Sequence, residues 1–94
     1  MPLKLEIFTP GAMVYQSKVV DSITLNTFDG EFEILPGHCS LIAVIKKGPI
    51  RIVQNGKQRL LMIDRGFVRL ISDKLSIVTE AAELKSFMER DDNF

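Results

Sequence analysis

The chain has 94 residues, of which 46% are hydrophobic and 26% are charged. This length allows one small domain with a modest core, and the composition is too apolar for a disordered chain. Twelve Lys and Arg residues balance twelve Asp and Glu residues, so there is no net positive field to attract nucleic acid or an anionic membrane. The composition therefore argues against nucleic-acid binding.

Neither a membrane-spanning segment nor a metal site is expected. The longest apolar run, Leu41 to Ile45, is far shorter than the roughly 20 residues of a spanning helix, so we expect no direct membrane insertion. The amino-terminal segment has the features of neither a secretory signal nor a transit peptide, which favours a bacterial cytoplasm or an organelle-encoded product. Cys39 is the single cysteine and His38 the single histidine, so we expect no disulfide, no metal and no cofactor.

The dominant period of the sequence is two, which predicts an all-β fold. Gly, Pro, Asn and Asp interrupt the alternation at short intervals, as is typical of strands joined by hairpins. Many short strands at this spacing predict a small β-sandwich or flattened barrel of antiparallel strands over residues 1–80. The expected strands cover residues 3–7, 19–26, 31–35, 41–45, 50–53, 60–63, 67–71 and 75–79.

The second and third expected strands form a hairpin. Val19, Ile23 and Leu25 share one parity and are expected on the buried face, while Asp21 interrupts that face and indicates a strand edge or a bulge. The pair Asp29-Gly30 supplies the positive φ angles of a two-residue turn. We therefore expect the strands on either side of this pair to pair with each other.

The segment Leu41 to Ile45 does not alternate. A continuous apolar run of this length predicts a strand that is covered on both faces. Two alternatives for the cover remain open, namely the second sheet of the domain and another protein.

The last segment, residues 81–94, changes period. Ala81, Leu84, Phe87 and Met88 recur at helical spacing, which predicts a short tail after the β-sandwich domain with one amphipathic helix. An isolated helix of this length is marginal in water, so it would form only if docked. A frayed tail is the alternative.

Candidate catalytic groups are few. His38 and Cys39 are neighbours, and neighbours on an extended chain point to opposite faces, so they are badly placed as a base and its nucleophile. Glu31 and Glu33 share one strand face, whereas acid and base catalysis needs carboxylates opposed across a cleft. No glycine-rich phosphate-binding motif is present. The residues by themselves indicate a β-sandwich interaction module, with a standalone ligand-binding protein or small enzyme that uses Glu31, Glu33 and His38 as the alternative.

A family resemblance starts from the stretch Gly30 to His38, which reads G-E-F-x-I-L-P-G-H and runs on into the apolar segment and Lys46-Lys47-Gly48. The opening strand Leu3 to Pro10 and the segment Gly66 to Glu80 agree with the same family in order and spacing. The chain resembles the N-terminal β-sandwich domain of the epsilon subunit of rotary F-type ATP synthases.

The resemblance implies a non-catalytic rotor subunit of the central stalk. Such a subunit clasps the gamma subunit and stands on the c-ring of the membrane sector, so that it couples ion translocation to ATP synthesis and hydrolysis. It implies a peripheral location on the cytoplasmic face of the bacterial inner membrane, within the ATP synthase complex. Family members commonly continue into a two-helix hairpin that can bind ATP or inhibit hydrolysis. Because only residues 81–94 follow here, we expect neither ATP binding nor inhibition by a helical arm.

The resemblance also gives two candidate contact sites. The turn Asp29, Gly30 and Glu31 is the candidate c-ring contact, because a hairpin tip with carboxylates can meet basic or amide groups of the ring loops. The alternative is a solvated turn. The candidate gamma contact lies at the apolar segment, which needs a cover, unless the second sheet alone covers it. Its residues are His38, Ser40, Ile42 and Val44.

Overall fold

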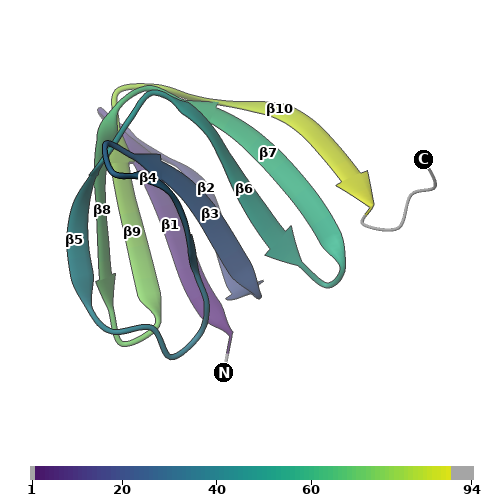
Figure 1. Cartoon of the computed structure of the whole chain (residues 1–94). Coiled ribbons are helices and arrows are strands. Elements are labelled where there is room, and N and C mark those ends of the chain that lie inside the picture. The colour runs from purple at the N-terminus through teal and green to yellow at the C-terminus, as the bar shows by residue number, and fades with distance from the viewer. Residues whose placement is uncertain (1, 90–94) are drawn as a thin grey trace.

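Ten β-strands account for most of the computed structural model, which describes residues 2–89 (Figure 1). The described part contains no helix, so the all-β prediction is confirmed. The strands are β1 (Leu3–Thr9), β2 (Ala12–Val20), β3 (Ser22–Thr27), β4 (Gly30–Ile34), β5 (Leu41–Ile45), β6 (Gly48–Gln54), β7 (Lys57–Ile63), β8 (Gly66–Ile71), β9 (Lys74–Thr79) and β10 (Ala82–Glu89).

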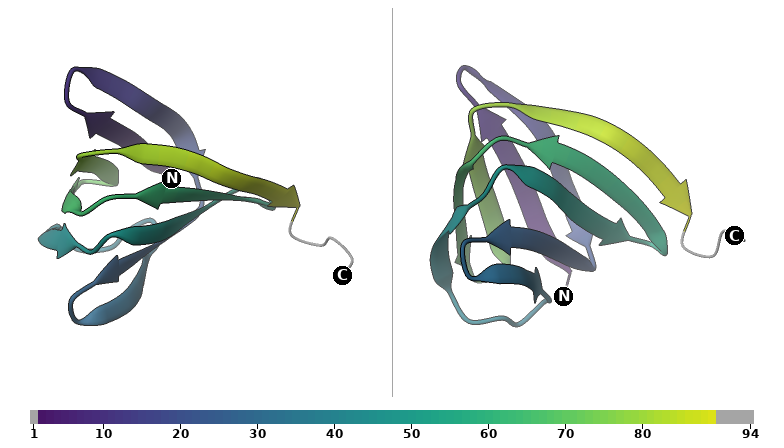
Figure 2. Two further views of the ribbon diagram at one scale, coloured as in Figure 1. Left: turned by 90° about the horizontal axis from the view of Figure 1, so that it is seen from above. Right: turned by 45° about the horizontal axis from the view of Figure 1, so that its top comes forward.

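One sheet curls over itself into a flattened sandwich. Its strand order is β10-β7-β6-β3-β5-β8-β9-β1-β2, and β4 pairs with β3 beside this path. One layer contains β10, β7, β6, β3 and β4, and the other contains β5, β8, β9, β1 and β2 (Figure 2). The layers join where Thr27 pairs with Ile45 and the Lys46 N–H donates to the Asn26 carbonyl oxygen at 2.9 Å. The sandwich prediction is therefore confirmed.

The first strand pairs with β9 in parallel, whereas the sequence predicted antiparallel strands. Leu5 lies beside Leu75, Ile7 beside Ile77 and Phe8 beside Val78. The other pairings of the described strands are antiparallel. A parallel neighbour far away in sequence leaves no local signal, because no turn connects the two strands.

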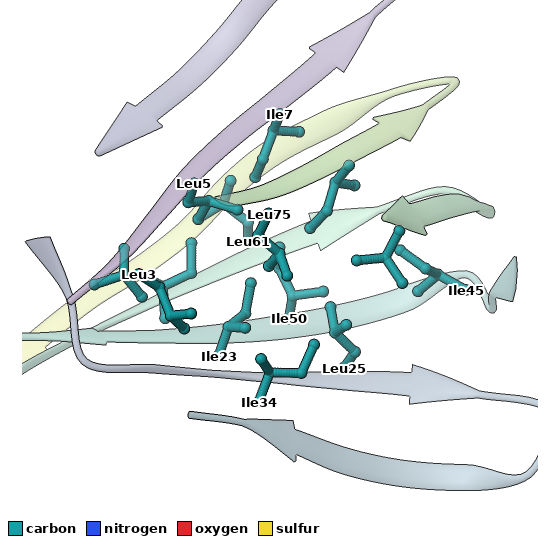
Figure 3. Close-up of a cluster of buried hydrophobic side chains, with 14 of the residues drawn as sticks. Leu3, Leu5, Ile7, Ile23, Leu25, Ile34, Ile45, Ile50, Leu61 and Leu75 are labelled. Carbon is teal, nitrogen blue, oxygen red and sulfur yellow. The ribbon is translucent and has the colours of Figure 1, made fainter. Parts of the chain in front are cut away.

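The core is built from aliphatic side chains that alternate along the strands, as the period of two predicts (Figure 3). Phe32 and Ala43 are only partly buried and pack against this core. The buried apolar residues are Leu3, Leu5, Ile7, Val20, Ile23, Leu25, Ile34, Ile45, Ile50, Ile52, Leu61, Ile63, Val68, Leu70, Leu75 and Ile77.

The prediction for the second strand was wrong at Val19, which is 45% exposed, whereas Val20 is buried. The chain forms two strands here, because Asp21 separates β2, which pairs with β1, from β3, which pairs with β4, β5 and β6. The Asp21 N–H donates to the Val53 carbonyl oxygen at 2.8 Å, and its carboxylate accepts from the Asn55 N–H at 3.0 Å. Parity therefore restarts after Asp21, and Ile23 and Leu25 lie in the core as predicted.

The β3–β4 hairpin forms as predicted, with its turn shifted by one position. Thr27 pairs with Gly30, so the two turn residues are Phe28 and Asp29. Gly30 begins β4 with a φ of 113°, which glycine tolerates more readily than any other residue. The Thr27 hydroxyl donates to the Gly30 carbonyl oxygen at 2.9 Å and accepts from the Asp29 N–H at 3.2 Å. These bonds hold the tip in a defined shape.

The segment Ala82–Glu89 is a strand, so the predicted helix is wrong for the part that the structure describes. It pairs antiparallel with β7, from Ala82 beside Ile63 to Glu89 beside Lys57. Backbone hydrogen bonds to an open sheet edge stabilise an extended chain, whereas a helix as short as this one is marginal by itself. The remaining residues of that prediction, 90–94, lie outside the described residues.

The turn into β8 depends on Gly66. A methyl group at this position would overlap the Val78 carbonyl oxygen and lie 2.9 Å from the Thr79 Cα. Both of those atoms belong to the backbone of the neighbouring strand, so a larger residue would have to push the two strands apart.

We expect Gly66→Ala to lower the free energy of unfolding by about 3 kcal/mol because of this overlap. Gly56→Ala is the matched control, since nothing lies within 4 Å of a methyl group there and only its φ of 74° is strained. We expect the control to lose about 1–2 kcal/mol. Urea unfolding measures both, and equal losses would contradict the importance of the close approach.

Candidate interaction surface

A row of apolar side chains crosses the outer face of one layer. Val44 on β5 pairs with Phe67 on β8, Phe67 pairs with Val78 on β9, and Val78 pairs with Phe8 on β1. These side chains point away from the core, because their neighbours Ile45, Val68, Ile77 and Ile7 are buried. Val44, Phe67 and Val78 are 47%, 57% and 53% exposed. We call Val44, Phe67, Val78 and Phe8 the outer row.

The outer row continues beyond Phe8 onto the next strand. Phe8 pairs with Met13 on the edge strand β2, and Met13 is itself 47% exposed. A shallow groove of about 390 Å³ follows part of the row, with Pro10 among its apolar residues and the charged groups of Arg65 and Glu80 in its lining. An apolar strip with charges beside it has the composition of a protein interface.

The next row along the same strands is mostly polar. Ile42 pairs with Arg69, Arg69 pairs with Ser76, and Ser76 pairs with Glu6. Glu6 forms an ion pair with Lys74 at 3.6 Å. Four apolar side chains therefore form one strip near the end of the layer, and the exposed Ile42 and Ile71 lie outside this strip on the same face.

The unalternated strand β5 has one buried and one exposed face. Ile45 is buried and Leu41 and Ala43 are half-buried, while Ile42 is 75% exposed and Val44 is 47% exposed. Within the described part of the chain, the second layer does not cover Ile42 and Val44. The continuous apolar run thus encodes an inner face for the core and an outer face that is exposed in the isolated chain.

Two of the four predicted gamma-contact residues lie apart from the outer row. His38 and Ser40 are exposed in the segment that precedes β5, toward the end of that strand opposite to Val44. The His38 N–H donates to the Leu35 carbonyl oxygen at 3.1 Å, and its Nδ1 lies 2.8 Å from the Cys39 carbonyl oxygen. Only Val44 belongs to the outer row, and Ile42 lies beside it in the next row.

The predicted ring-contact residues Asp29, Gly30 and Glu31 are all exposed at the tip of the β3–β4 hairpin. Phe28, a residue that the sequence reasoning missed, is 72% exposed at the same tip. The Lys46 ammonium lies 5.8 Å from the centre of its ring, within the range of a cation–π contact. The tip therefore combines carboxylates with an exposed aromatic ring.

The residues of the alternative enzyme hypothesis do not come together. Glu31 lines a groove beside the hairpin tip, and Glu33 lines a different, polar groove with Arg51. His38 follows the far end of β4, away from the tip that holds Glu31. The described residues also contain no cluster of three or more His, Cys, Asp or Glu side chains that could hold a metal ion.

Sequence reasoning found Val44 but missed the rest of the outer row. Phe67 and Ile71 stand at the parity opposite to the buried Val68 and Leu70, and two large apolar residues on the outer parity of a strand are a usable signal. Val78 and Phe8 give no such signal, because only the parallel pairing of β1 with β9 places them in the row.

The chain is a small β-sandwich with an apolar strip on its outer face and with dispersed titratable groups. These features are typical of the class of interaction modules. No helix in residues 2–89 has the length and hydropathy needed to cross a bilayer. Residues 2–85 match the family model of the ATP synthase Delta/Epsilon chain, beta-sandwich domain, and the chain belongs to this family. This match confirms the resemblance seen in the sequence. The family is one of non-catalytic subunits.

Curated relatives carry the same assignment. The chain is 33% identical over 89 residues to the ATP synthase epsilon chain of Alkalihalophilus pseudofirmus, covering 95% of this chain and 66% of the relative. It is 40% identical over 81 residues to that of Campylobacter jejuni subsp. doylei, covering 85% of this chain and 62% of the relative. The chain thus spans slightly less than two thirds of the length of these relatives.

Two solved structures share the fold. A chain in the Euglena gracilis mitochondrial ATP synthase structure, described as OSCP/F1/c-ring, superimposes with a TM-score of 0.82 at 23% identity, covering 88% of this chain and 53% of that chain. A chain of the Tetrahymena thermophila mitochondrial ATP synthase central stalk/c-ring gives a TM-score of 0.67 at 18% identity, covering all of this chain and 74% of that one.

Proposed function

We propose that the chain is a rotor subunit of a rotary F-type ATP synthase, which clasps the gamma subunit and contacts the c-ring. In this role it transmits rotation between the ring and the central stalk, and the chemistry of ATP belongs to other subunits. It acts as a peripheral part of the complex on the cytoplasmic face of the bacterial inner membrane. Family membership and the presence of the same fold in ATP synthase central-stalk structures support this function.

The proposed gamma contact rests on one observation, which is the exposure of the apolar outer row. Val44, Phe67 and Val78 lie in register across neighbouring strands, and all three are about half exposed. Contiguous apolar surface of this kind is stabilised when a partner excludes water from it. We therefore propose that the gamma contact is centred on the outer row and includes the neighbouring Ile42, whereas His38 and Ser40 lie outside its centre.

The ring contact belongs to the hairpin tip. Asp29 is exposed in the two-residue turn, whose shape is held by the Thr27 hydroxyl, and Glu31 is exposed close by on β4. A rigid projecting turn with carboxylates can meet basic or amide groups on the ring without ordering a flexible loop. The outer row and the tip lie at the same end of the sandwich, since Val44 is next to Ile45, which pairs with Thr27 at the base of the tip.

Phe67→Asp should weaken binding of a gamma subunit from the same source by about 30-fold or more, because it places a charge in the middle of the apolar strip. Isothermal titration calorimetry measures the affinity, and circular dichroism checks the fold. Leu35→Asp is the matched control, since Leu35 is 50% exposed at the other end of the sandwich. Unchanged gamma affinity in a folded Phe67→Asp variant would exclude the outer row.

Glu31→Arg should lower the proton-pumping yield of the assembled enzyme while leaving the stability of the isolated chain unchanged, because Glu31 is exposed at the tip. Glu33→Arg makes the same charge change on the same face of β4 but within a different groove, so it should leave the yield unaltered. A yield that is undiminished in Glu31→Arg would exclude the tip as the ring contact.

A further inference from the structure

The strand β10 is attached to the sandwich by one interrupted ladder. It lies at the end of the strand order, and within the described residues it pairs only with β7. The register shifts between Leu84 and Ser86, so that Lys85 forms a bulge. A bulge leaves one residue of the strand unpaired and disrupts the ladder locally. Few backbone contacts therefore have to break for β10 to leave the sheet.

The beginning of β10 is fixed more firmly than the rest. The Ala81 carbonyl oxygen accepts from the Asp64 N–H at 3.0 Å and from the Thr79 hydroxyl at 3.2 Å. Thr79 is buried, and Ala82 packs against the core. Release of the strand would therefore begin after Ala82.

The neighbouring strand β7 has a second partner. It pairs with β6 in an uninterrupted register from Lys57 to Ile63, through the two-residue turn at Asn55-Gly56. Leu61 and Ile63 are buried, and β6 pairs in turn with β3. We therefore expect β7 to keep its place in the sheet when β10 leaves it.

The sequence of β10 favours a different conformation from the one it adopts. Leu84, Phe87 and Met88 recur at helical spacing, whereas a regular strand separates neighbours such as Phe87 and Met88 onto opposite faces. A local preference that disagrees with the tertiary position narrows the free-energy gap between two forms. The conflict falls on the one segment that is held by an interrupted edge ladder and follows a fixed point.

We propose that residues 83–89 exchange between the strand β10 and a released helical form, with the sandwich unchanged up to Ala82. The strand is the major form of the isolated chain, because so short a helix is marginal without a surface to dock on. Release frees the edge of β7 and gathers the apolar positions of the segment on one side of a helix. A partner that binds either surface shifts the population toward the released form. The inference rests on strand pairing alone, so its failure would leave the proposed function untouched.

The register identifies the amides that report on release. Beyond the two-residue turn, alternate residues of β7 bond to β6 and the others to β10. Leu60 and Met62 face β10, where they lie beside Ser86 and Glu83. Pro49 lies beside Met62 on the β6 side and has no N–H to donate, which agrees with this assignment.

Amide hydrogen exchange of the unaltered chain, followed by NMR, tests the release. Relative to unstructured peptides, we expect the Leu60 and Met62 amides to exchange about 100-fold faster than those of Arg59 and Leu61, because the latter require the β6–β7 ladder to open. The alternation within one strand is its own control. Equal rates at Leu60 and Leu61 would overturn the inference, since β10 would then open only together with the sheet.

A reversible lock tests whether release of β10 is the source of this exchange. Lys57→Cys with Glu89→Cys, in a Cys39→Ser background, allows a disulfide at the far end of β10, because these two residues lie opposite each other. The oxidised variant should exchange the Leu60 amide about tenfold more slowly than the same variant after reduction, which is the matched control. Equal rates in the two redox forms would overturn the release.

Carbon chemical shifts distinguish a helix from a merely frayed strand. Chemical exchange saturation transfer on the unaltered chain gives the Cα shifts of the minor form, which we expect at helical values across residues 83–88. Minor-form shifts of an unstructured chain would overturn the helical form.

Two substitutions at one position shift the exchange in opposite directions. Alanine favours a helix and threonine favours a strand, so the Leu60 amide should exchange about tenfold faster in Ser86→Ala than in Ser86→Thr. The Leu61 amide should exchange equally in both variants. The reverse order at Leu60 would contradict the exchange between strand and helix.

Discussion

The parallel pairing of β1 with β9 is the contact on which the rest of the structure depends. It brings Leu5 and Ile7 beside Leu75 and Ile77. In this way it joins β1, the first strand of the chain, to β9 in the layer that also contains β5 and β8. The same register puts Phe8 beside Val78 on the opposite face. One backbone ladder thus completes both the core and the apolar strip outside it, because side chains alternate between the faces of a strand.

That alternation separates stability from binding. The inward positions of β5, β8, β9 and β1 carry aliphatic side chains that fill the core, and burying them supplies most of the driving force for folding. The outward positions contribute little to that core, so they can carry Phe67 and Val78 for a partner or Arg69 and Ser76 for water. A substitution in the outer row can therefore change the exposed surface without unfolding the domain.

The end of the sandwich at the β3–β4 tip concentrates the features that a partner can use. Val44 of the outer row, a groove lined by Phe28 and Ile42, and the carboxylates of Asp29 and Glu31 all lie near the point where Thr27 pairs with Ile45. This pairing joins the backbones of the two layers next to the tip.

The sequence by itself determined eight of the ten strands, β1 and β3 to β9, together with most of the core parity and the turn at Asn55-Gly56, whose positive φ angles of 53° and 74° agree with its hairpin signal. These features depend on neighbours a few residues apart. Tertiary structure decided the parallel partner of β1, the strand at Ala82–Glu89 and the exposure of Phe28. Each of these depends on contacts between segments distant in sequence, and local periodicity carries no information about which distant strand lies alongside.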